Sequence, residues 1–166
     1  MKTGMLIIGL ILLLICALPV VLLYLNSIIK EKRFIKKLFN YAKQSNCIIS
    51  EYDLWKNTVI GIDKVVNKLF FIRETIIDEC EREINLSEIQ NCRIANVNRT
   101  INNKNGNYKV TDKLELVFIY REKNKPETKL EFYNSDKDSL ILNGEIQLAE
   151  KWSGLVETMI EQLAKV

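Results

Sequence analysis

Side chains that could carry out chemistry are scarce in this chain of 166 residues, which contains no histidine. Histidine is the commonest general base and a common zinc ligand, so His-based catalytic triads are excluded. Cys47, Cys80 and Cys92 lack C-x-x-C spacing and predict buried, inert thiols and no structural zinc site. The acidic groups at 78–83 and 136–138 fall in turns or beside strands, where carboxylates are usually solvated. The sequence therefore predicts a protein that is not an enzyme, with no cofactor and no metal site.

The basic residues are concentrated in one short segment. Up to Asn40 they exceed the acidic residues by about five, while the whole chain carries +3, so the remainder is slightly acidic. A domain with an acidic balance is not expected to bind nucleic acid. A basic cluster can bind anionic lipid at a membrane surface. The cluster predicted to do so is formed by Lys30, Lys32, Arg33, Lys36 and Lys37.

The cluster follows an apolar run from Met5 to Leu25 that contains no charge. About 20 apolar residues can span a bilayer, so the sequence predicts a tail at 1–4 and a transmembrane helix at 5–29. A cleaved signal peptide has a shorter apolar core, and the large Ile15 before Cys16 disfavours a lipoprotein site. Because flanking basic residues stay cytoplasmic, we expect a single-pass protein of the cytoplasmic (inner) membrane. Its N-terminus would lie outside and its domain in the cytoplasm.

The elements that follow change from helix to strand. The basic segment 30–46 has apolar residues near a 3.6 period, which predicts a helix that lies in lipid headgroups or, as we favour, packs on the domain. The domain would occupy 47–166. Within 48–134, short apolar segments separated by polar turns predict about six or seven strands. In 113–121 the apolar Leu114, Leu116 and Phe118 alternate with other residues, as in a strand with one buried face.

The end of the chain predicts one amphipathic helix at 144–164. Its apolar face contains Trp152, which we expect to be its largest anchor in the core. Asn143 or Gly144 is suited to the N-cap, and Glu145 is favourable in the first turn. Strands followed by one such helix suggest that the helix closes a small antiparallel barrel or sandwich.

This order of elements resembles the pleckstrin-homology-like (PH-like) fold, and in particular bacterial single-pass membrane-anchored proteins that carry this domain. The stretches that carry the likeness are 52–63, 84–89 and 133–152. The resemblance implies about seven antiparallel strands capped by one C-terminal helix. In phosphoinositide-binding members, basic residues of the first strands hold phosphates. The corresponding residues here are Lys56, Lys64, Lys68 and Arg73, without the K-x-n-(K/R)-x-R spacing of those members.

Two functions are compatible with these features. The first is a non-enzymatic binding or scaffold module, held at the cytoplasmic face of the bilayer, that engages a protein partner by an exposed groove or sheet edge. The alternative is a domain that senses an anionic lipid or small ligand through the basic segment. The fold alone does not decide between them, because one fold serves many functions.

Overall fold

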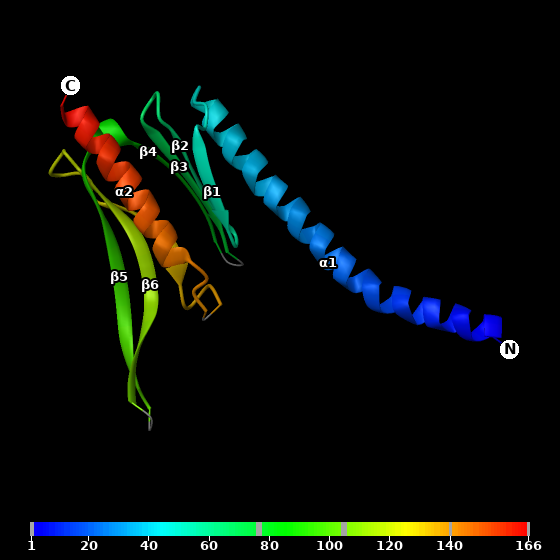
Figure 1. Ribbon diagram of the computed structural model, residues 1–166. Helices are drawn as coiled ribbons and strands as arrows, with labels where there is room; N and C mark the ends of the chain where they lie inside the picture. The colour runs from blue at the N-terminus through cyan, green and yellow to red at the C-terminus, as the bar shows by residue number, and fades with distance from the viewer. Residues whose placement is uncertain (1, 76–77, 104–105, 140, 166) are drawn as a thin grey trace.

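The computed structural model describes the backbone of residues 2–75, 78–103, 106–139 and 141–165, and side chains from residue 15 onward except those at 101–108. Seven strands form two antiparallel sheets, and a helix follows at the C-terminal end (Figure 1). The predicted mainly-β domain with a C-terminal helix is therefore confirmed at this level.

Four consecutive strands form the first sheet, which we call sheet A. They are β1 (Glu51–Trp55), β2 (Thr58–Asp63), β3 (Lys68–Glu74) and β4 (Glu79–Asn85), paired in that order. Every residue of β2 is buried, because both faces of sheet A are covered. On its inner face Ile60, Ile62, Leu69 and Phe71 belong to the main core.

The second sheet, sheet B, contains β5 (Ile89–Asn103), β6 (Gly106–Tyr120) and β7 (Thr128–Asn134), reached from β4 through the short helix η1 (Leu86–Glu88). Its core-facing residues include the alternating set predicted from the sequence, Leu114, Leu116 and Phe118. β5 and β6 are longer than the sequence pattern indicated, because their polar outer halves continue the hairpin where a turn-rich stretch was expected.

The C-terminal helix α2 (Glu145–Ala164) packs across η1, β5, β6 and β7. Its apolar face places Ala149, Trp152 and Val156 in the main core with no exposed surface. The Trp152 Nε1–H group donates to the Asp53 carboxylate of β1 at 2.8 Å. The buried indole thus packs in the core and links α2 to sheet A, as expected for an anchor with one polar atom.

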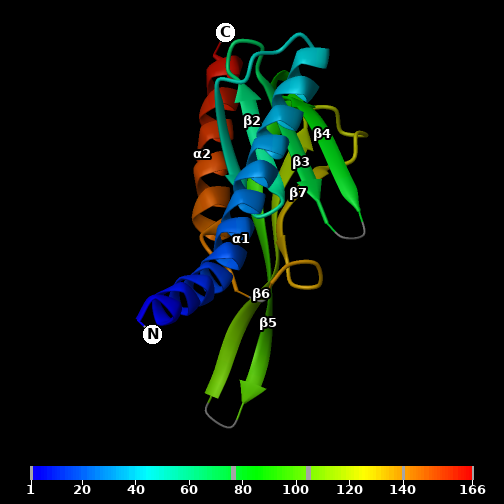
Figure 2. The same cartoon turned by 90° about the vertical axis from the view of Figure 1, so that its right-hand side faces the viewer.

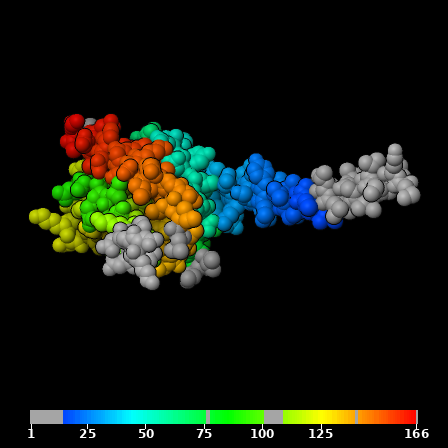
Figure 3. Space-filling view, turned by 60° about the horizontal axis from the view of Figure 1, so that its bottom comes forward, coloured from blue at the N-terminus to red at the C-terminus, as the bar shows by residue number. Residues whose placement is uncertain are grey.

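The N-terminal helix α1 (Lys2–Gln44) is continuous and extends from the domain as a stalk (Figures 1 and 3). Its last turns pack on the outer face of sheet A, where Phe34, Leu38 and Ala42 contact a second apolar cluster (Figure 2). Gly61 of β2 makes this close approach feasible, since a Cβ at that position would lie 2.8 Å from Leu38 Cδ2.

One prediction requires correction. Among the residues that the structure describes, no helix combines the length and the apolarity needed to cross a membrane. The transmembrane helix at 5–29, and with it the single-pass location in the cytoplasmic membrane, is contradicted by this finding. The side chains of residues 5–14 lie outside the described part of the chain. Side chains of the apolar run are described only at 15–25, which is shorter than the about 20 residues that a bilayer core requires.

Candidate functional site

The four basic residues predicted to contact phosphates lie at separate places in sheet A. Lys56 is in the β1–β2 turn, Lys64 is in the β2–β3 turn at the other end of the strands, and Lys68 and Arg73 lie at opposite ends of β3. Lys56, Lys64 and Lys68 form ion pairs with Glu145, Glu51 and Glu83 at 2.6, 2.8 and 2.6 Å. The structure therefore does not gather the four residues into one phosphate site.

The basic segment of α1 is partly neutralised by sheet A. Arg33 pairs with Glu74 at 2.8 Å, and Lys37 pairs with Glu74, Glu79 and Glu81. These contacts hold the last turns of α1 on the domain in addition to the apolar cluster. Within the described part of the chain, three members of the segment are exposed and form no ion pair: Lys30, Lys32 and Lys36.

Arg73 occupies a different environment from the other three basic residues. It follows Leu69 and Phe71 on the inner face of β3, so the alternation of the strand directs it between the two sheets, where it is only 5% exposed. Its Nη1 donates to the Glu131 carbonyl at 3.2 Å, and its Nη2 donates to the Asp138 carboxylate at 2.9 Å. A buried guanidinium needs such partners, because an unpaired buried charge is strongly destabilising.

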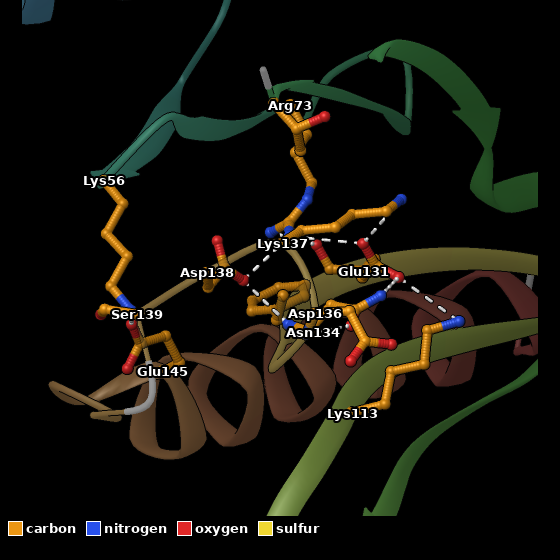
Figure 4. A network of polar contacts seen from close by, with 12 residues as sticks. Lys56, Arg73, Lys113, Glu131, Asn134, Asp136, Lys137, Asp138, Ser139 and Glu145 are labelled. Atoms are coloured by element: carbon orange, nitrogen blue, oxygen red, sulfur yellow. Dashed lines mark hydrogen bonds and ion pairs between the residues drawn. The ribbon is translucent and has the colours of Figure 1, made fainter. Parts of the chain in front are cut away.

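The contacts of Arg73 belong to a network that joins β3, β6, β7 and the loop before α2 (Figure 4). Asp138 also accepts a hydrogen bond from the Asn134 N–H at 2.8 Å. The Glu131 carboxylate lies 3.3 Å from Lys113 and 3.5 Å from Lys137. Burial raises the pKa of Glu131. The hydrogen bond from Asn134 and the charge of Arg73 lower this pKa by more than burial raises it, so the net shift is downward. Glu131 is therefore ionised at neutral pH.

A cavity of ≈ 210 Å³ opens beside this network, between β3–β4 and β6–β7. We call it the inter-sheet cavity. Phe71 supplies an apolar wall, and the remaining wall is polar. The residues that line the cavity are Phe71, Arg73, Thr75, Asp78, Cys80, Lys113, Glu115, Lys129, Glu131 and Lys137. Of these, the sequence had singled out Arg73 as a candidate contact, Cys80 as a thiol, and Asp78 only within the acidic group 78–83 that was expected to be solvated.

The other two described thiols of the domain, Cys47 and Cys92, are poor nucleophiles. Cys47 and Cys92 are buried, and burial raises the pKa of both, to about 12 for Cys92. Each thiol is consequently protonated at neutral pH, and a thiol is a much weaker nucleophile than a thiolate.

The outer half of the β5–β6 hairpin is a second candidate functional region, in addition to the inter-sheet cavity. We call residues 96–112 the arm, and Figures 1 and 2 show that it projects beyond the rest of the domain. β6 pairs with β7 only between Lys113 and Phe118, so within the described residues no third strand pairs with the arm. Its described side chains are largely exposed, including Val97 at 52%. Comparison of the chain with protein-family models, with curated proteins and with solved structures gives no match.

Proposed function

We propose that this chain is a non-enzymatic binding module of PH-like architecture whose arm engages a protein partner. The architecture is supported by a four-stranded sheet, then a three-stranded sheet, then a helix that packs on the second sheet. The observation that carries the proposed function is the arm itself, a two-stranded ribbon whose outer edges pair with no other described strand; the Ser135 N–H donates to the Asp112 carbonyl at the base of the arm.

An arm of this kind is suited to β-strand addition. A two-stranded ribbon is marginally stable in water, and a third strand would supply hydrogen-bond partners to one edge. The backbone would provide affinity, while side chains of the added strand would provide specificity. The partner would therefore contribute an extended segment.

The charge of the arm indicates the composition of that segment. Residues 96–112 contain three basic residues (Arg99, Lys104 and Lys109) and one acidic residue (Asp112), although the chain beyond Asn40 is acidic overall. Complementary charge favours the correct partner and its rate of association. We therefore expect the extended segment to be acidic.

The alternative, recognition of an anionic lipid or small ligand by the basic segment, remains an untested prediction. The ion pairs of Arg33 and Lys37 with sheet A weigh against it, because a headgroup would have to compete with those carboxylates.

The test is a selection of displayed random peptides on the full chain, repeated on an arm-shortened variant. In that variant Asn-Gly replaces residues 98–112, since Val97 and Lys113 are paired and this dipeptide closes a two-residue hairpin. We expect selected peptides to be acidic and extended, and to bind the shortened variant about tenfold or more weakly. Circular dichroism and urea unfolding would establish that the shortened variant is folded.

A charge reversal tests the same proposal without changing the backbone. Lys109→Glu should weaken the selected peptides, whereas Lys123→Glu, at an exposed lysine of the β6–β7 loop, should not. Peptides that bind the shortened variant and Lys109→Glu as tightly as the native chain would refute a role for the arm, as would a selection that enriches none.

A further inference from the structure

The loop before α2 contains a pair of residues that can react with each other. Asn-Gly occurs at two places in the sequence, 105–106 and 143–144, and the structure describes both residues of the second pair. In such a pair the glycine nitrogen can attack the side-chain carbonyl carbon of the asparagine, because glycine has no Cβ to obstruct the approach. The reaction requires an asparagine amide that is free to turn and a glycine N–H that is not bonded elsewhere.

Asn143 and Gly144 meet both requirements within the described part of the chain. Asn143 is exposed, and its only hydrogen bond there is made by its main-chain N–H, which donates to Glu145. Gly144 is the N-cap of α2: its carbonyl accepts from the Leu148 N–H at 3.0 Å, while its own N–H has no described partner. The surroundings are open, since a Cβ built on Gly144 would lie 4.0 Å from its nearest listed neighbour, Gln147 Oε1. The φ of 98° favours glycine at this position, so the fold itself places the reactive pair here.

Asn134 shows the opposite arrangement. Its Nδ2 donates to the Glu131 carboxylate at 2.8 Å, and its Oδ1 accepts from the Asp136 N–H at 3.0 Å. Both ends of this amide are held, and the next residue is Ser135 rather than glycine. Asn134 is therefore an internal control for the reactivity of Asn143.

We propose that Asn143–Gly144 is a site of self-modification, at which the chain forms a succinimide and then an aspartate or isoaspartate. The Gly144 nitrogen attacks Asn143 Cγ, so that an N–Cγ bond forms and the Cγ–Nδ2 bond breaks. The amide nitrogen leaves as ammonia with the proton of the Gly144 nitrogen. Water then opens the ring: cleavage at Cγ gives aspartate, and cleavage at the main-chain carbonyl carbon gives isoaspartate. This site is separate from the arm and does not depend on the function proposed for it.

The position of the site couples the reaction to the packing of α2. The Glu145 carboxylate, which is 2% exposed, accepts from the Asn143 N–H and pairs with Lys56 of the β1–β2 turn at 2.6 Å. Isoaspartate lengthens the main chain by one atom, which displaces the Asn143 N–H, and it adds a second negative charge beside Glu145. Because a buried carboxylate that loses a partner is destabilising, we expect the isoaspartate form to hold the first turn of α2 less firmly.

The experiment follows the native full chain during storage in mildly alkaline buffer made with isotope-labelled water. Trypsin cleaves after Lys and Arg, so Asn134 falls in the peptide 130–137 and Asn143 in the peptide 138–151. Digestion in ordinary water distinguishes conversion during storage from conversion during the digestion. Fragment mass spectra locate each converted residue, and an isoaspartyl methyltransferase detects isoaspartate.

We expect position 143 to lose its amide, to take up oxygen from the labelled water and to yield isoaspartate. The rate should rise with pH, because the attacking nitrogen must lose its proton. Asn134 should keep its amide in the same samples. The thermal midpoint of the stored native chain should be lower than that of the fresh chain.

Three variants test the assignment. Asn143→Gln retains an exposed amide but requires a larger ring, so conversion should be lost and storage should leave the thermal midpoint unchanged. Gly144→Ala places a Cβ beside the attacking nitrogen and should also block conversion. Gln147→Ala, at a neighbouring exposed residue, should convert as the native chain does. If Gly144→Ala fails to fold, Asn143→Gln still decides the question.

Several outcomes would overturn the proposal. A native chain that keeps the amide of Asn143, whether or not the urea-unfolded chain loses it, would show that the folded loop does not close the ring. A product without isoaspartate would indicate direct hydrolysis of the amide by water. Conversion of the peptide 138–151 that persists in Asn143→Gln would place the reaction at another residue. Equal thermal midpoints of the converted and fresh native chains would contradict the effect on α2.

Discussion

The two sheets of this domain differ in how their outer regions are covered. Sheet A has the main core on one face and α1 on the other, so that Val59, Phe70 and Ile72 are buried on the side away from sheet B. Sheet B extends an arm that no other described strand covers, and its described side chains are polar or exposed. The covered region should therefore determine stability, and the arm should be free to change with little effect on the fold.

The largest effect should come from the contact between α1 and sheet A. Phe34 is 1% exposed in the second apolar cluster, and Phe34→Ala should lower the free energy of unfolding by about 3–5 kcal/mol. Val97→Ala in the arm, where the side chain is 52% exposed, should change it by no more than about 0.5 kcal/mol. Urea unfolding of the full chain measures both. Similar losses in the two variants would refute the proposed difference between the sheets.

Overpacking of the same interface gives the next effect. A larger side chain at Gly61 must displace the buried Leu38 and Ile49, so Gly61→Val should cost about 1–3 kcal/mol. Gly154 is a matched control, since a Cβ there meets no atom within 4 Å and α2 is helical at this position. Gly154→Ala should stabilise the chain by about 0.5–1 kcal/mol. If Gly61→Val and Gly154→Ala shifted the thermal midpoint in the same direction, the explanation that Gly61 is required by the close approach of α1 would be contradicted.

Asp63 should make the covered sheet sensitive to acid. Its carboxylate is 3% exposed and accepts hydrogen bonds from the N–H groups of Ile48, Val65 and Val66 at 2.7, 2.9 and 3.1 Å. Burial raises the pKa of Asp63. The three hydrogen bonds together lower it by more than burial raises it, so the net pKa is below the ordinary 3.8. A lowered pKa stabilises the folded chain above the ordinary value, and this contribution is lost as the pH falls through the folded pKa.

The measurement is the free energy of unfolding between about pH 6 and pH 2, a range that brackets the ordinary pKa of a carboxyl group. Asp63→Asn should cost about 1–2 kcal/mol at neutral pH, because the amide places a donor against one backbone N–H. The free energy of unfolding of the variant should also decrease less on acidification than that of the native chain, because the variant has no carboxylate to protonate at position 63. An unchanged acid slope in Asp63→Asn would show that other carboxylates account for it.

The smallest effect is expected in the arm. Arg99 and Asp112 form an ion pair at 3.0 Å, with side chains 52% and 29% exposed. Such a pair is screened by solvent, so Arg99→Ala should change stability by less than about 0.5 kcal/mol. Amide hydrogen exchange sharpens the comparison, since the arm should exchange much faster than β2 and β3. Slow exchange throughout the arm would mean that it is stabilised by more than its own pairing.

Sequence patterns were sufficient for the elements with regular apolar spacing. The alternation of Leu114, Leu116 and Phe118 predicted a strand, and the apolar face around Trp152 predicted α2, because burial of one face requires that spacing. The first strand of the arm was expected as far as residue 101, but the continuation at 102–110 was interpreted as a turn, because this asparagine-rich stretch alternates too weakly to be told from a loop. The hairpin there is defined by register, which the side-chain pattern specifies poorly when neither face is buried.

The inter-sheet site was predictable only in part. Arg73 could be singled out as a basic residue, but its partners Glu131 and Asp138 lie 58 and 65 positions away in the sequence. Their meeting depends on how the two sheets pack, which no local pattern encodes. Arg73 itself continues the inward alternation of Leu69 and Phe71, and a charged residue at such a position is the signal that could have indicated a buried polar network.

The continuity of α1 has a mechanical consequence. A helix of 43 residues is roughly 65 Å long at 1.5 Å per residue, and only its last turns pack on sheet A, where Leu38 lies over Gly61. The rest of α1 therefore extends as one helix from its contact with sheet A. A force applied at the N-terminal end of α1 would be transmitted to β2 and β3. Within the described residues, no flexible linker separates that end from the turns of α1 that pack on these strands.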